Sequence, residues 1–77
     1  MDIKDFIEKF AEAIEIDDTS VLNGKTEFRV LDDWNSLSTL SVIAMVDDEY
    51  GVALRNDDFN KSATINDLFE IIKNKQV

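Results

Sequence analysis

The stretch LDDWNSLSTLSVIAMVDDEYG, residues 31–51, decides the fold that we expect for this chain. Its polar beginning ends at Asn35, a residue type that caps helices by accepting hydrogen bonds from the backbone N–H groups of the first turn. From Ser36 onward, apolar residues recur at helical spacing as far as Tyr50, and Gly51 follows where a left-handed C-cap is common. The sequence therefore predicts one helix from Ser36 to Tyr50.

The hydroxyl of Ser36 is the chemically distinctive group of this helix. Because Asn35 supplies the cap, the hydroxyl at the first helical position is predicted to be free. It faces the positive end of the helix dipole, where backbone donors favour a phosphate group. A phosphodiester on Ser36 would therefore be electrostatically favourable. The alternative is an ordinary serine at the start of a helix, which is the commoner use of this residue type.

The predicted helix carries more apolar surface than a small bundle can bury. Helical spacing separates its apolar side chains into two stripes. The longer stripe has the larger volume and is expected to face the core: Thr39, Val42, Ile43, Val46 and Tyr50. The shorter stripe is expected to form a surface patch beside Ser36: Leu37, Leu40 and Ala44.

An acidic run, Asp47, Asp48 and Glu49, occupies the last turns of the same helix. The negative end of the dipole makes each acid unfavourable there by about 0.3 to 1 kcal/mol. A solvated charged face is the simplest interpretation. Next to an exposed apolar patch and a free serine, however, a docking site for a basic partner explains the acids better. The residues predicted to bind partners are Asn35, Leu37, Leu40, Ala44, Asp47 and Asp48.

The motif Asn35-Ser36-Leu37, followed by an apolar helix that ends in an acidic run, resembles the acyl carrier protein family. In that family the serine of an Asp-Ser-Leu motif is esterified with phosphopantetheine. The resemblance extends over nearly the whole chain, through its length, its acidity, the long loop before the motif and the order of the helices. It implies that a phosphopantetheinyl transferase attaches 4'-phosphopantetheine from coenzyme A to Ser36.

The resemblance also implies a function. The chain would carry acyl, aminoacyl or polyketide intermediates as thioesters and present them to acyl-transferring and chain-modifying enzymes with basic docking patches. Three positions depart from the family pattern: Asn35 replaces the usual aspartate, and Ser38 and Ser41 replace acids found in many fatty-acid carriers. Trp34 before the motif is more similar to stand-alone carriers of specialised pathways. These differences imply a carrier with its own set of partners, in fatty-acid synthesis or in a specialised pathway.

Composition limits the remaining possibilities. A chain of 77 residues with 44% hydrophobic content is expected to form one domain, residues 1–77. The formal net charge of −9, from 17 acids and 8 bases, argues against nucleic-acid binding. The absence of histidine and cysteine removes the usual catalytic bases, thiol nucleophiles and zinc ligands. No stretch resembles a signal peptide or a membrane span, so we expect a cytoplasmic monomer that does not insert into membranes.

The rest of the chain predicts an all-α bundle of three long helices and one short one, with a long first loop. Residues 2–14 form an amphipathic helix, and a turn near Phe59 and a helix after Thr64, with Asp67 in a capping box, follow the central helix. The loop over 15–35 is expected to contain a turn of helix within 17–20. Its expected tethers to the core are Val21, Leu22, Phe28, Val30 and Leu31, and Trp34 is expected to pack as a staple against the central helix rather than lie exposed.

Two rivals to the carrier hypothesis belong to other classes. The first is an acidic helical interaction module that is never modified and binds one partner permanently through the same leucines and acids. The second is a calcium-binding protein, suggested by the acidic pairs at 17–18 and 57–58, although adjacent pairs lack the alternating ligands of a dedicated calcium loop. An enzyme is the least favoured class.

Overall fold

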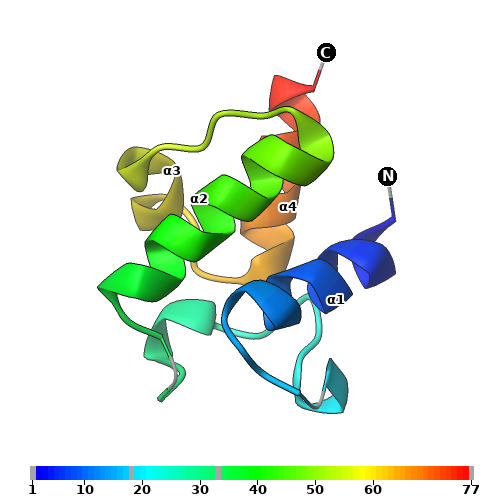
Figure 1. Cartoon of the computed structure of the whole chain (residues 1–77), viewed down its shortest axis with the longest axis vertical. Coiled ribbons are helices and arrows are strands. Elements are labelled where there is room, and N and C mark those ends of the chain that lie inside the picture. Colours follow the sequence, from blue (N-terminus) through cyan, green and yellow to red (C-terminus); the bar gives the residue numbers. More distant parts are fainter. Residues whose placement is uncertain (1, 18, 33, 77) are drawn as a thin grey trace.

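A computed structural model describes residues 2–17, 19–32 and 34–76 of the chain. Every regular element in these ranges is helical, and none is a strand, so the predicted all-α fold is confirmed (Figure 1). Three helices are long and one is short, and a long connection precedes the second, as predicted. The elements are α1 (Ile3–Ala13), η1 (Thr19–Val21), η2 (Phe28–Val30), α2 (Ser36–Tyr50), α3 (Asn56–Asn60) and α4 (Ile65–Lys75).

Helix α1 begins and ends with identifiable caps. Asp2 Oδ1 accepts a hydrogen bond from Lys4 N at 3.1 Å at the beginning. At the end, Glu15 has a positive φ of 62°, and Ile16 N donates back to Ala11 O at 2.8 Å. This is a Schellman motif in which a glutamate occupies the left-handed position that glycine usually takes. The helix stops within a residue of its predicted end.

The core forms where α1 packs against α2 and α4. Four aromatic rings from different segments, which we call the aromatic cluster, close one end of it: Phe10, Phe28, Trp34 and Phe59. Trp34 stacks on Phe10 with ring centroids 5.9 Å apart and meets Phe28 edge-on at 5.0 Å. The prediction that Trp34 packs is confirmed. Its ring partners, however, lie in α1, η2 and α3 rather than in the helix that it precedes.

The first loop is tethered to the core by fewer residues than predicted. Leu22 and Phe28 are buried, and Leu31 is half-buried. Val21 and Val30 are 61% and 75% exposed, so their predicted role as tethers is wrong. The expected turn of helix is found at η1, slightly later than predicted, and η2 was not expected. A tight 3₁₀ turn directs neighbouring side chains to different sides, so only part of each apolar pair in this loop can reach the core.

The same loop is bonded to the start of α4. Thr26 O accepts a hydrogen bond from Ile65 N at 3.0 Å, and Gly24 O accepts one from Asn66 N at 2.8 Å. These carbonyls satisfy first-turn N–H groups of α4 that have no partner inside the helix. A Cβ atom at Gly24 would collide with the Asn66 side chain, so glycine permits this close approach.

The predicted capping box of α4 is confirmed. Asp67 N donates to Thr64 Oγ1 at 3.2 Å, and Asp67 Oδ2 accepts from Thr64 N at 3.1 Å and from Ala63 N at 3.0 Å. The hydrogen bonds from the Ala63 and Thr64 N–H groups lower the pKa of Asp67 below its ordinary value. None of the described helices combines the length and the apolar character needed to cross a bilayer.

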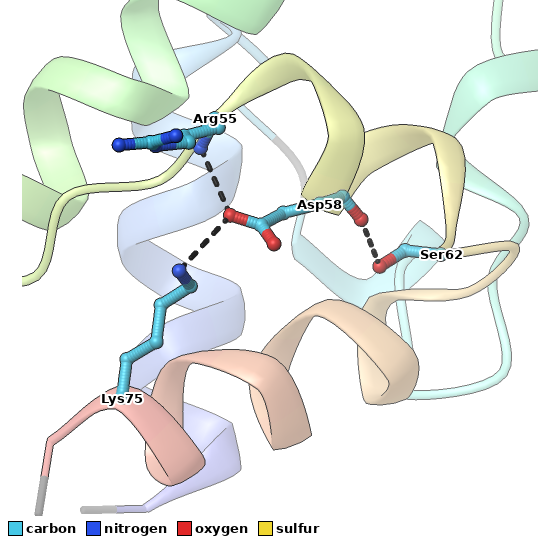
Figure 2. A network of polar contacts seen from close by, with 4 residues as sticks. All are labelled: Arg55, Asp58, Ser62 and Lys75. Atoms are coloured by element: carbon cyan, nitrogen blue, oxygen red, sulfur yellow. Dashed lines mark hydrogen bonds and ion pairs between the residues drawn. The ribbon is translucent and has the colours of Figure 1, made fainter.

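Helix α3 is a single turn held by Asp58 (Figure 2). Asp58 Oδ2 accepts a hydrogen bond from Arg55 N at 2.9 Å and lies 3.5 Å from Lys75 Nζ near the end of α4. Asp58 O accepts from Ser62 Oγ at 2.8 Å. Phe59 is buried. The side chain that binds the start of α3 is thus Asp58.

We expect Asp58→Ala to lower the free energy of unfolding by about 1–2 kcal/mol, because it removes a hydrogen bond to Arg55 N and the ion pair with Lys75. Lys75→Met removes only the half-exposed ion pair and should change stability by about 0.5 kcal/mol. Urea unfolding followed by circular dichroism measures both changes. Equal losses in the two variants would contradict the role assigned to the hydrogen bond.

Candidate functional site

The predicted cap of α2 is confirmed. Asn35 Oδ1 accepts hydrogen bonds from Leu37 N at 2.8 Å and from Ser38 N at 3.1 Å. Asn35 N in turn donates to Ser38 Oγ at 3.1 Å, which completes a capping box. Gly51 closes the other end with a φ of 66°, as predicted. The bounds of this helix are therefore set by local interactions that can be predicted from the sequence.

Ser36 is the first residue of α2 and is exposed. The cap is formed by Asn35 together with Ser38, and within the described ranges neither the hydroxyl nor the N–H of Ser36 has a hydrogen-bond partner. The hydroxyl thus stands at the positive end of a helix of 15 residues. Together with the adjacent N–H donor, it offers a position where a phosphate group is favoured.

Ser38 has a structural role that the sequence did not indicate. Ser38 is 6% exposed, and its hydroxyl is part of the capping box with Asn35. Ser38 therefore contributes little to the exposed surface of α2.

A shallow hollow of about 300 Å³ lies beside Ser36, between the first turns of α2 and the start of α3. Thr39 and Asn56 give it hydrogen-bonding groups, and Leu40 gives it an apolar wall. Sequence reasoning missed Asn56, because nothing in the local pattern of α3 indicates that its first residue lies near Ser36. Only the path of the chain from Gly51 back to the beginning of α2 brings it there (Figure 1).

The outward stripe of α2 is confirmed. Leu37 is 71% exposed and Leu40 is 60% exposed, and Ala44 is also exposed. The inward stripe is confirmed as well: Val42 and Val46 are buried, and Thr39, Ile43 and Tyr50 are half-buried.

The predicted partner-binding residues border more than one hollow. Leu40 lines the hollow beside Ser36. Asn35, Leu37, Ala44 and Asp48 instead line hollows between α1 and α2. Asp47 is exposed and lines none of these three hollows. On α2 itself, Leu37, Leu40, Ala44, Asp47 and Asp48 lie on one side of the helix, since residues three, four and seven apart share a helix face.

The acidic end of α2 is exposed at all three positions, 47, 48 and 49, and no basic residue lies in the last turn. Glu49 Oε1 lies 4.0 Å from Lys9 Nζ on α1, and both side chains are partly exposed, so this pair adds little stability. The acids therefore contribute mainly to the electrostatic potential of the surface.

Tyr50 ends α2 with an unusual environment for its hydroxyl. Its ring packs against Phe6 at a centroid distance of 6.0 Å, and its Oη atom is buried without a hydrogen-bond partner in the part of the chain that the structure describes. Burial, followed by the nearby negative charges of Asp5 and Glu49, raises the pKa of Tyr50 above its ordinary value. The phenol therefore stays neutral at physiological pH and acts as a core side chain.

Across residues 2–17, 19–32 and 34–76, no three His, Cys, Asp or Glu side chains are grouped so that they could hold a metal ion. The two acids at 57–58, which suggested calcium binding, lie in different environments: Asp57 is exposed, whereas Asp58 accepts a hydrogen bond from Arg55 N and forms an ion pair with Lys75. Of the pair at 17–18, residue 18 lies outside the described residues.

No protein-family model, curated protein or solved structure matches the chain.

Proposed function

We propose that this chain is an acyl carrier protein of the cytoplasm that bears 4'-phosphopantetheine on Ser36 and carries acyl, aminoacyl or polyketide intermediates as thioesters. One observation carries the proposal: Ser36 is exposed at the first position of α2, and the capping box of Asn35 and Ser38 does not use it, so the Ser36 hydroxyl has no partner within the described ranges. Folding makes no use of this hydroxyl, which is therefore available for esterification.

The surroundings of Ser36 suit the phosphopantetheine group. A phosphodiester on Ser36 Oγ would lie at the positive end of α2, close to the unbonded N–H of the same residue. The hollow formed with Thr39, Leu40 and Asn56 borders Ser36 and offers both polar and apolar contacts. An arm that contains amide and methyl groups would meet groups of both kinds there.

The exposed side chains of α2 support a role in transient docking. Leu37 and Leu40 would be buried by a phosphopantetheinyl transferase or by an acyl-transferring enzyme, and Asp47 and Asp48 would attract a basic patch. Charge attraction with a small apolar contact gives fast association and modest affinity. A carrier that must leave one enzyme to reach the next requires this combination.

The proposal is tested by incubating the purified chain with coenzyme A, magnesium and a phosphopantetheinyl transferase of broad specificity. We expect intact-mass spectrometry to report the addition of one phosphopantetheinyl group, and peptide mapping to place it on Ser36. If transferases that modify a known carrier in parallel leave this chain unchanged, the proposal is wrong. The unmodified helical interaction module then becomes the better account of the leucines and acids.

A further inference from the structure

Asn23 and Gly24 form an asparagine–glycine pair, a dipeptide in which the side-chain amide of asparagine is readily lost. The pair lies in the loop between η1 and η2 and begins a turn, in which Thr26 N donates to Asn23 O at 3.0 Å. Lys25 N donates to Asn23 Oδ1 at 2.7 Å, which makes this an Asx turn as well. Asn23 is exposed, so water reaches its side chain.

The turn supplies the groups that a deamidation reaction needs. The nucleophile is the backbone nitrogen of Gly24, whose N–H has no hydrogen-bond partner in the described part of the chain. The electrophile is Asn23 Cγ. It belongs to the same small hydrogen-bonded ring as Gly24 N, because the bond from Lys25 N to Asn23 Oδ1 closes that ring. The same bond stabilises the negative charge that forms on Oδ1 during attack.

We propose that Asn23 is a site of spontaneous deamidation, and that the reaction releases the first loop from α4. Gly24 N gives its proton to a base in the solvent and forms a bond to Asn23 Cγ, and the side-chain nitrogen leaves as ammonia. Water then opens the five-membered ring by breaking one of its two bonds to Gly24 N, which regains a proton. Opening at Cγ gives aspartate. Opening at the main-chain carbon gives isoaspartate, in which the main chain runs through Cβ and Cγ.

The other asparagines lack this combination of features. Four of them lie within helices, where the following backbone nitrogen is held in helical geometry: Asn56, Asn60, Asn66 and Asn74. Asn35 is the best internal comparison, because Leu37 N donates to its Oδ1 at 2.8 Å and the N–H of Ser36 is also unbonded among the described residues. However, Ser36 N is fixed in the first turn of a helix of 15 residues, and serine has a Cβ that glycine lacks. Asn35 should therefore react more slowly than Asn23.

Isoaspartate at position 23 would not fit without a movement of the loop. Gly24 lies so close to the Asn66 side chain that an added Cβ atom would collide with it. Gly24 O also accepts the hydrogen bond from Asn66 N at 2.8 Å, and Thr26 O accepts one from Ile65 N at 3.0 Å. Isoaspartate adds one carbon to the main chain directly before Gly24. It would therefore displace both carbonyls and leave two first-turn N–H groups of α4 unbonded.

Aspartate at position 23 should disturb the loop much less. A carboxylate can accept the hydrogen bond from Lys25 N, because aspartate forms Asx turns as asparagine does, and the length of the main chain is unchanged. Both products carry one additional negative charge, so the net charge becomes −9 − 1 = −10 in each. The Asn23→Asp variant therefore separates the effect of the charge from the effect of the longer main chain.

The first test follows the reaction in the purified chain, kept in neutral buffer for several days and analysed by peptide mapping. We expect a carboxylate to replace the amide at Asn23 about tenfold faster, or more, than at Asn35. A methyltransferase specific for isoaspartate, supplied with labelled S-adenosylmethionine, should methylate the aged chain. It should not methylate an aged Asn23→Gln chain, because glutamine would have to form a six-membered ring. Equal rates at Asn23 and Asn35, or reaction first at another asparagine, would overturn the proposal.

The second test measures the release of the loop by amide hydrogen exchange, after ion exchange has separated the isoaspartate form. We expect the N–H groups of Ile65 and Asn66 to exchange about tenfold faster, or more, than in the original chain. In the Asn23→Asp variant they should stay within about threefold of the original. Unchanged exchange in the isoaspartate form, or equal acceleration in the variant, would overturn the release of the loop.

The proposal does not depend on modification of Ser36, because the reacting groups lie in a loop that is bonded to α4. Ser36→Ala should deamidate at Asn23 as the original chain does. Asn23→Gln should in turn accept phosphopantetheine as the original chain does. Failure of either proposal therefore leaves the other standing.

Discussion

Phe28→Ala is expected to lower the free energy of unfolding by about 3–5 kcal/mol, the range typical of a phenylalanine removed from a packed core. The side chain of Phe28 is completely buried and lies at the centre of the aromatic cluster. Its ring is 5.7 Å from that of Phe10, 5.0 Å from that of Trp34 and 6.2 Å from that of Phe59. Its loss would leave a cavity bordered by three rings from three segments.

The loss is large relative to the stability available. For 77 residues, a typical stability is about 4–12 kcal/mol, so the variant should be partly unfolded or close to it at 25 °C. Urea unfolding followed by far-UV circular dichroism measures the change, and fluorescence of Trp34, the only tryptophan, reports on the cluster itself. The matched control is Val30→Ala, two residues away in η2 at a position 75% exposed, which should change stability by less than about 0.5 kcal/mol. Similar losses in both variants would contradict the assignment of Phe28 as the anchor of the loop.

Ser36→Ala is expected to abolish the addition of phosphopantetheine while leaving the fold intact. The hydroxyl is exposed and unbonded among the described residues, and alanine is a good helix former, so stability should change by less than about 0.5 kcal/mol. The cap by Asn35 does not involve the Ser36 side chain. Loss of modification without loss of stability would show that Ser36 is needed for attachment and not for folding. A serine with a purely structural role would give the opposite result, a loss of stability.

Intact-mass spectrometry after incubation with the transferase measures the first effect, and thermal unfolding measures the second. Ser20→Ala, at an exposed serine in η1, is the control and should be modified as the original chain is. In cells that require the protein, the Ser36→Ala chain should fail to support formation of its product. Normal product formation would contradict the carrier function, even if the serine can be modified in vitro.

The central helix could be predicted closely because its determinants are local. The cap at Asn35, the glycine at 51 and the spacing of Val42 and Val46 lie within or next to the helix that they define. The exposure of Leu37 and Leu40 also followed from spacing, because the longer stripe left them no place in the core. The availability of the Ser36 hydroxyl was predicted on the same grounds.

The loop was predicted less well, because apolar character alone does not determine burial. Leu22 and Val21 are adjacent and similar in type, yet one is buried and the other exposed. The difference arises from the 3₁₀ turns and from the hydrogen bonds that Gly24 and Thr26 make with the start of α4, about forty residues away. No local pattern contains that information.

By itself, then, the sequence determined the positions of the long helices and which apolar stripe of α2 faces the core. It also determined that the Ser36 hydroxyl at the beginning of α2 takes no part in the cap. All of these features depend on capping residues and on the helical repeat. Only the tertiary structure decided that Trp34 packs on Phe10 and Phe28, that Asn56 lies beside Ser36, and that Leu40 and Ala44 serve two different hollows. These features depend on which residues distant in sequence meet when α1, α2 and α3 pack together. Packing at that range follows from the shape of the whole core rather than from any one segment.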